Sequence, residues 1–102
     1  MFKSTPFKRS QRVSDLIRKE VASIFLFDLR DPRLKNLTIS RVEMSDDLSN
    51  ATIYYFSNFL ESEGDELQKV LAKSKGFIKL LLGKRLSLKK IPKISFKEES
   101  DA

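Results

Sequence analysis

The sequence predicts a small α+β domain in which helices pack on one face of a three-stranded sheet. Two parts of the chain carry apolar residues at helical spacing, and three short segments are rich in β-branched and aromatic residues. Turn-forming residues separate these segments, so the predicted order of elements is α-β-β-α-α-β. A hairpin followed by a helical connection into a third strand favours this layered architecture.

The first predicted helix covers residues 10–29. Its apolar residues recur at the spacing of one helical face: Val13, Leu16, Ile17, Val21 and Ile24. Ser10 can cap the start of this helix. Pro32 ends it, because proline disfavours helical geometry at the preceding residue and has no N–H to donate.

Three segments read as strands because they combine β-branched and aromatic residues with approximate alternation. The first two are Leu37–Met44 and Asn50–Ser57, and the turn formers of "SDDLSN" join them as a hairpin. The third predicted strand is Lys93–Glu99, which follows Pro92.

Between the hairpin and the last strand, the sequence predicts two helices rather than one. The first runs from about Asp65 to Ser74, and a leucine-rich second helix runs from Phe77 to about Lys89. Gly76 lies between them, and a glycine inside a continuous helix would cost about 1 kcal/mol relative to alanine. We therefore expect a break in the helix near Gly76.

Composition argues against an enzyme. The chain has no cysteine and no histidine, which removes disulfides, the commonest zinc ligand and the usual general base. No apolar run has the length of a signal peptide core or a membrane span, which predicts a cytoplasmic protein. With 102 residues we expect a single domain, 1–102, with loose ends at 1–6 and 100–102. It is expected to be a monomer without cofactor, metal or small-molecule substrate.

Positive charge is concentrated in the second half of the chain. Residues 71–97 carry nine lysines and arginines and no carboxylate, within an overall net charge of +6. Such a block attracts phosphate backbones through Coulomb attraction and counterion release. A solvated helix face and a contact with an anionic membrane surface are the alternative interpretations.

Two smaller features have alternative interpretations. Asp46 and Asp47 are adjacent carboxylates, which fit a solvated turn better than a catalytic pair, because no nucleophile or metal ligand accompanies them. Tyr54, Tyr55 and Phe56 could stack RNA bases, or they could fill the core and cover the sheet.

The segments "RVSDLIRKEVASIF", "DPRL", "NATIYY" and "GFIKLLLGKRLSLKKIPKISF", taken together, closely resemble ribosome-binding factor A. The resemblance covers about Arg9 to Ser100. It implies a KH-like domain of the second topological type and a non-enzymatic factor that binds the 16S rRNA of immature 30S ribosomal subunits. It also implies a role in late subunit maturation, in processing of the 5′ end of 16S rRNA, and in cold adaptation.

The same resemblance places an interhelical kink at Ser74-Lys75-Gly76, where family members carry Ala-x-Gly. Gly76 would act through backbone geometry, and the Ser74 hydroxyl can bond either a local carbonyl or an RNA phosphate. The basic residues that we expect to contact phosphates lie in the first helix, in the "DPRL" turn and in the basic block: Lys8, Arg9, Arg12, Arg33, Lys73, Lys75, Lys79, Lys84, Arg85, Lys89 and Lys90.

Two other functions remain open at this point. The chain could be a general KH-like module that binds single-stranded RNA and has no ribosomal role. It could also be a protein–protein adaptor that uses the acidic stretch Glu61–Glu66 against a basic partner.

Overall fold

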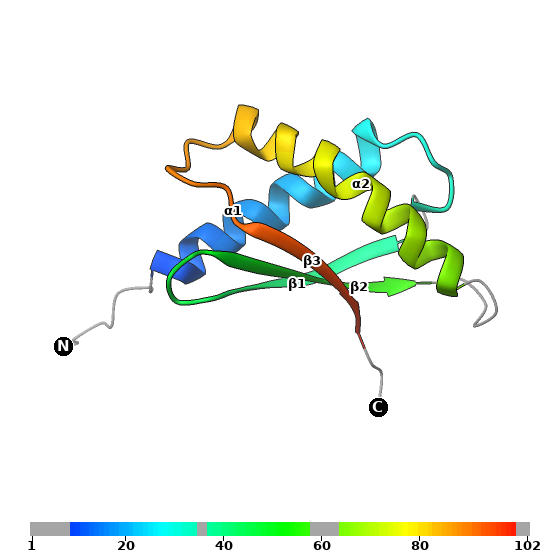
Figure 1. Ribbon diagram of the computed structural model, residues 1–102, viewed down its shortest axis with the longest axis horizontal. Helices are drawn as coiled ribbons and strands as arrows, with labels where there is room; N and C mark the ends of the chain where they lie inside the picture. Colours follow the sequence, from blue (N-terminus) through cyan, green and yellow to red (C-terminus); the bar gives the residue numbers. More distant parts are fainter. Residues whose placement is uncertain (1–8, 35–36, 58–63, 100–102) are drawn as a thin grey trace.

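The structure is a computed structural model that describes residues 9–34, 37–57 and 64–99. Figure 1 shows two long helices on the same side of a three-stranded sheet. The elements in chain order are α1 (Arg9–Ser23), the π-helical turn η1 (Ile24–Asp28), β1 (Leu37–Met44), β2 (Asn50–Ser57), α2 (Gly64–Arg85) and β3 (Lys93–Glu98). The predictions for Lys8 and for the two chain ends concern residues outside these ranges.

The sheet is mixed, with β2 in the centre. β1 pairs antiparallel with β2 through the predicted hairpin, and β3 pairs parallel with β2 on its other side. A parallel pair needs a long connection between its strands, and α2 provides it. The predicted arrangement of helices over one face of a three-stranded sheet is therefore confirmed.

A bulge in β1 keeps both halves of this strand facing the helices. Ile39 pairs with Tyr55 and Arg41 pairs with Tyr54, so Ser40 is an extra residue in β1. Side chains alternate along a strand, and one inserted residue therefore restores the apolar side chains to the same face. The apolar residues that face the helices along β1 are Leu37, Ile39, Val42 and Met44.

The hydrophobic core lies between the helices and the sheet. Each element contributes side chains at the spacing of its own period: Val13, Ile17 and Val21 from α1; Ala51, Ile53 and Tyr55 from β2; Leu67, Leu71, Ile78 and Leu82 from α2; and Ile94 and Phe96 from β3. Burial of each large aliphatic side chain stabilises the fold by roughly 1.5–3 kcal/mol. The opposite face of the sheet carries no helix in the described part of the chain (Figure 1).

The predicted break at Gly76 is wrong, because α2 is one helix from Gly64 to Arg85. Leu67, Leu71, Ile78 and Leu82 repeat at intervals of four and seven residues, so one buried face continues across the glycine. Gly76 lies on the exposed side, where an added Cβ would meet no atom within 4 Å. Burial of the leucine and isoleucine side chains beyond it outweighs the helix propensity lost at one glycine.

In the part of the chain that the structure describes, no helix combines the length and the apolar character needed to cross a membrane.

Candidate nucleic-acid interface

α2 carries four lysines outside its buried face, on two of its sides. Lys73, Lys79 and Lys84 are exposed, and Lys75 is half-buried. At roughly 100° per residue, Lys75 and Lys79 lie on one flank of α2, and Lys73 and Lys84 lie on its outer side. None of the four forms an ion pair with another described residue. We call these four residues the α2 lysine surface, and its positive charge is not neutralised by the described part of the protein.

A depression of about 310 Å³ lies beside this surface, between α2 and the turn that follows η1. It brings together three of the predicted residues, Arg33, Lys73 and Ser74, with Arg30 from the same turn. Arg30 is exposed and forms no ion pair within the described ranges. The sequence interpretation missed Arg30, although its place one residue before "DPRL" was the available signal.

Arg33 is engaged inside the protein. Its Nε and Nη2 atoms donate to the two carboxylate oxygens of Asp31 at 3.0 and 2.8 Å, and its Nη1 lies 3.2 Å from Oε2 of Glu66. Side-chain hydrogen bonds from Arg33 hold the pKa of Asp31 below its usual value. An RNA phosphate would have to compete with two carboxylates for Arg33, so its first role is to fix the turn against the start of α2.

Two features of the Ser74-Lys75-Gly76 tripeptide are visible. The hydroxyl of Ser74 donates to the carbonyl oxygen of Val70 at 2.9 Å, which is the local bond that the sequence allowed. Gly76 leaves the outer side of α2 free of a side chain between Lys75 and Phe77. The tripeptide therefore lies within a continuous helix, next to the depression that contains Lys73.

Arg85, which is also predicted to contact phosphate, is engaged inside the protein. Its Nη1 donates to Oε2 of Glu20 at 3.0 Å and to Oδ2 of Asp28 at 2.8 Å. The hydrogen bond from Arg85 lowers the pKa of Asp28. Arg85 therefore joins the last turn of α2 to α1 and η1, and its charge is compensated within the fold. At 100° per residue it is on the buried side of α2, which explains why it reaches the other helix.

Lys89 and Lys90 lie beyond the end of α2, not on a helix as predicted. They line a second depression, of about 470 Å³, together with Arg9 and Asp47. We call Arg9, Lys89 and Lys90 the end cluster. Arg12, another predicted residue, is exposed on α1.

The aromatic residues of β2 divide between the two faces of the sheet. Tyr55 is in the core, whereas Tyr54 and Phe56 lie on the helix-free face. The guanidinium of Arg41 lies 3.8 Å from the centre of the Tyr54 ring, and the Tyr54 hydroxyl donates to Glu43 at 2.9 Å. Arg41 thus covers one face of Tyr54, and a stacked base would have to displace it. Tyr55 therefore fills the core, and Tyr54 takes part in a surface network with Arg41 and Glu43.

The predicted turn at Asp46 and Asp47 is confirmed. Asp47 accepts hydrogen bonds from the Ser45 hydroxyl at 2.8 Å and from the Ser49 hydroxyl and amide at 2.7 and 3.1 Å. These hydrogen bonds, with those from Ser49 the largest cause, lower the pKa of Asp47 to about 2. Asp47 therefore closes the hairpin turn between β1 and β2.

The fold and its surface define a small α+β domain with an uncompensated basic helix face. Residues 9–102 match the family model of ribosome-binding factor A. A relative from Syntrophus aciditrophicus with that name is 44% identical over 96 residues, covering 94% of this chain and 78% of the relative. One from Streptococcus mutans is 45% identical over 94 residues, covering 90% and 81%. The chain belongs to the ribosome-binding factor A family.

Solved structures agree with this assignment. A solution NMR structure of a Thermotoga maritima protein described as a ribosome binding factor A is 33% identical, with a TM-score of 0.78 over 96% of this chain and 93% of that one. The Thermus thermophilus crystal structure shares the fold, at 21% identity and a TM-score of 0.76, over 87% and 94% of the chains. A model of the Thermus thermophilus factor, fitted into a cryo-EM map of a 30S complex, has a TM-score of 0.68 at 23% identity, over 82% and 88%.

Proposed function

We propose that this protein is a non-enzymatic assembly factor that binds the 16S rRNA of the immature 30S ribosomal subunit. The observation that carries the proposal is the α2 lysine surface, found without internal counter-charges in a chain of the ribosome-binding factor A family. The Thermus thermophilus factor of the same name has been fitted into a map of a 30S complex, which supports the same partner here. Lysines reaching phosphates would supply affinity that depends on salt.

The basic residues form two groups, and we propose that both contact RNA backbone. Lys73 and Arg30 lie near the C-terminal end of η1, and the end cluster lies at the N-terminus of α1. α1 and η1 together contain 20 residues, so Arg30 and the end cluster are separated by about 30 Å. Phosphate contacts position a protein without reading sequence, so specificity would come from the shape of the rRNA across both groups.

The proposed mechanism is a shift in rRNA conformation. A factor that binds one conformation more tightly than others increases its population, without any chemical step. Assistance to late maturation, to processing of the 5′ end of 16S rRNA and to growth in the cold would follow from this effect, as would a cytoplasmic location. These functions rest on membership of the family.

We also propose that the domain has the KH-like topology of the second type. The mixed sheet and the order of helices and strands support this assignment. The functional form of the Ser-x-Gly motif would then be a bend within the continuous α2, rather than a break between two helices. Ser74 and Gly76 would place Lys73 and Lys75 against the RNA backbone.

The test is a charge reversal at Lys75 and Lys79. We expect the double Lys→Glu variant to lose most binding to purified immature 30S subunits in sedimentation assays, with an unchanged melting temperature. The slope of log affinity against log salt should fall by roughly 1.5–2, as expected for two lost phosphate contacts. The matched control reverses Lys19 and Lys97, which are exposed on α1 and β3.

Full binding by the Lys75/Lys79 variant would show that the α2 lysine surface is not the interface. A wild-type protein that binds short single-stranded RNA but does not sediment with 30S subunits would favour the general RNA-binding module. Association with a basic protein partner and no RNA affinity would favour the adaptor. Of the acidic stretch proposed for an adaptor, the described part includes Glu66, which is paired with Arg33.

A further inference from the structure

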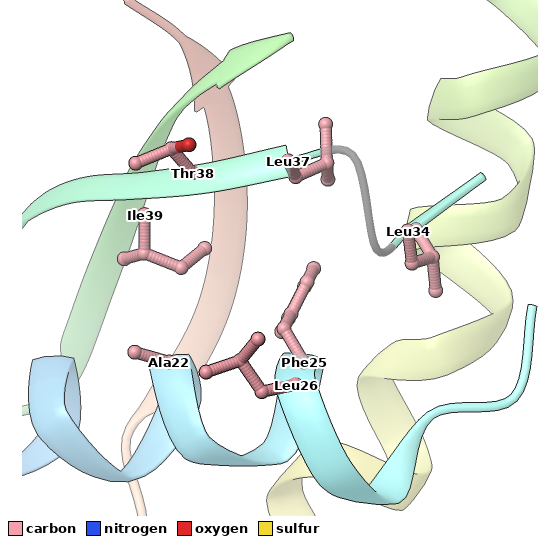
Figure 2. A pocket seen from close by; sticks show the side chains of 7 residues that line it. All are labelled: Ala22, Phe25, Leu26, Leu34, Leu37, Thr38 and Ile39. Carbon is pink, nitrogen blue, oxygen red and sulfur yellow. The ribbon is translucent and has the colours of Figure 1, made fainter. Parts of the chain in front are cut away.

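A second surface runs along the free edge of β1. An apolar pocket of about 270 Å³ opens there between β1 and the C-terminal part of the first helix. Figure 2 shows its lining: Leu37 and Ile39 come from β1, and Ala22, Phe25 and Leu26 come from α1 and η1. Leu26 is 62% exposed at the rim, and the next residue, Phe27, is 79% exposed.

The pocket lies beside unpaired backbone. β1 is an edge strand, since β2 is its only partner in the sheet that the structure describes. The N–H and C=O groups on the outer side of an edge strand can pair with an added strand. An extended peptide that pairs with β1 could place one apolar side chain into the pocket beneath it.

The same edge also carries an unmatched positive charge. Ala22 lines the apolar pocket, and Ser14 lines a neighbouring depression against Val42 and Met44. Arg18 lies one helical turn from each of them and thus on the same side of α1, between the two hollows. Arg18 forms no ion pair with another described residue, whereas Arg33, Arg41 and Arg85 each do. A carboxylate on a ligand in this groove would find a partner there.

We propose that the α1–β1 edge binds an extended peptide of a partner protein by β-strand addition. The peptide places a large aliphatic side chain in the apolar pocket and a carboxylate near Arg18. Arg18 lies about 9 Å along the helix axis from the middle of the pocket, which is between two and four residues of an extended strand. Only an even separation puts both side chains on the same face of the strand, so the ligand is an extended segment with an aliphatic anchor and an acidic residue two positions away.

The site favours a peptide over RNA. The pocket is lined mostly by aliphatic and aromatic side chains, and the lysines proposed for rRNA lie on α2. α2 extends over the β3 side of the sheet, while α1 lies over β1, so both ligands can bind at the same time (Figure 1). The peptide site therefore does not depend on the proposed RNA-binding function.

The experiment titrates isotope-labelled protein with two synthetic octapeptides while amide chemical shifts are recorded. Both alternate threonine and valine around a central leucine, with aspartate two positions before the leucine in one and two after it in the other. This pair covers parallel and antiparallel addition. We expect one of them to bind with a Kd below about 1 mM and to shift the amides of Ala22 and of residues 37–39.

Variants of both partners test the two recognition elements. Leu26→Glu and Arg18→Glu should each weaken binding about ten-fold, as should replacement of the peptide leucine by alanine. The matched control is Leu80→Glu on α2, where the leucine is 53% exposed, and it should bind as the wild type does. Melting temperatures of both leucine variants would verify that each remains folded.

Five results would overturn the proposal. The first three are that neither peptide saturates the protein below 1 mM, that the chemical-shift changes appear on α2, and that Leu26→Glu binds the peptide as well as the control variant does. A concentration-dependent dimer that Leu26→Glu abolishes would instead assign this edge to a second copy of the chain. An octauridine that shifts the same amides would assign it to RNA.

Discussion

The contribution of Gly76 depends on which side of α2 it occupies. A glycine in a helix interior weakens the helix wherever it lies, because it has more freedom to lose on folding. At Gly76 no neighbouring atom requires the absence of a side chain, and the buried residues of α2 continue on both sides of it. For stability alone, glycine is therefore not the best residue at this position.

We expect Gly76→Ala to stabilise the protein by about 1 kcal/mol, measured by urea unfolding. Gly83→Ala is the comparison: its Cβ would meet Ile91 at an ordinary distance of 3.6 Å, and its place in the last turn predicts a smaller gain. Unchanged or reduced stability in Gly76→Ala would contradict the helical geometry at residue 76. A loss of 30S binding with increased stability would support a functional bend.

Asp47 makes stability depend on pH at the hairpin turn. Its pKa is about 2 in the folded protein, below the usual 3.8, because the carboxylate accepts bonds from Ser45 and Ser49. The stabilisation is complete above pH 3.8 and is lost as the pH falls through about 2. Stability falls with falling pH because the pKa of Asp47 is lower in the folded protein, so the unfolded state binds the proton more tightly.

Asp47→Asn should therefore reduce the difference in melting temperature between pH 5 and pH 2. Asp46→Asn is the control, because Asp46 is exposed and forms no hydrogen bond with another described residue. The same pH dependence in Asp47→Asn and wild type would show that the turn does not depend on the ionised carboxylate.

At the scale of elements, the bulge in β1 determines which side chains reach the core. With Ser40 present, Leu37 and Ile39 face the helices together with Val42 and Met44. If Ser40 took a paired position instead of a bulge, one half of β1 would shift by one residue and turn toward solvent. The bulge is therefore part of the register of the hairpin.

Deletion of Ser40 should keep Leu37, Ile39, Val42 and Met44 facing the helices, because the remaining residues of β1 alternate regularly against the same partners in β2. We therefore expect it to cost less than the roughly 1.5–3 kcal/mol that exposure of one large apolar side chain would cost. Urea unfolding followed by circular dichroism measures the change. Ser40→Ala is the control, since it keeps the residue count and removes only the bond from the Ser40 hydroxyl to Glu99, at 2.8 Å. A loss of about 3 kcal/mol or more in the deletion variant, with Ser40→Ala close to wild type, would show that packing of β1 requires the bulge itself.

For the whole molecule, local sequence patterns predicted the elements well and their long-range contacts poorly. The bounds of β1 and β2 match the predicted segments, because alternation and turn residues are local signals. The predicted break at Gly76 is wrong, because burial of Ile78 and Leu82 against the sheet outweighs the helix propensity lost at one glycine. That burial is a long-range effect and is not visible in the local sequence.

The residues of the candidate interface could also be predicted only in part, because some of them depend on long-range contacts. Lys73 and Lys79 are exposed and Lys75 is half-buried on one helix, as a local basic pattern suggests. Arg85 bonds to Glu20, 65 residues away, a pair that no local pattern contains. The pairing of Arg33 with Asp31 could be predicted from the sequence, because only Pro32 separates the two residues. The grouping of Arg9 with Lys89 and Lys90 likewise depends on a long-range contact, between the start of α1 and the segment that follows α2.

The central position of β2 also bears on how the chain folds. β1 reaches β2 through a short turn, whereas Asn50 of β2 pairs with Lys93, 43 residues further along the chain. Closing the longer loop costs more entropy, so the hairpin has the lower kinetic barrier. One edge of β2 therefore stays open until α2 and β3 dock, and a nascent or partly folded chain would expose that edge to other strands. Docking of β3 protects the protein from aggregation as well as completing its sheet.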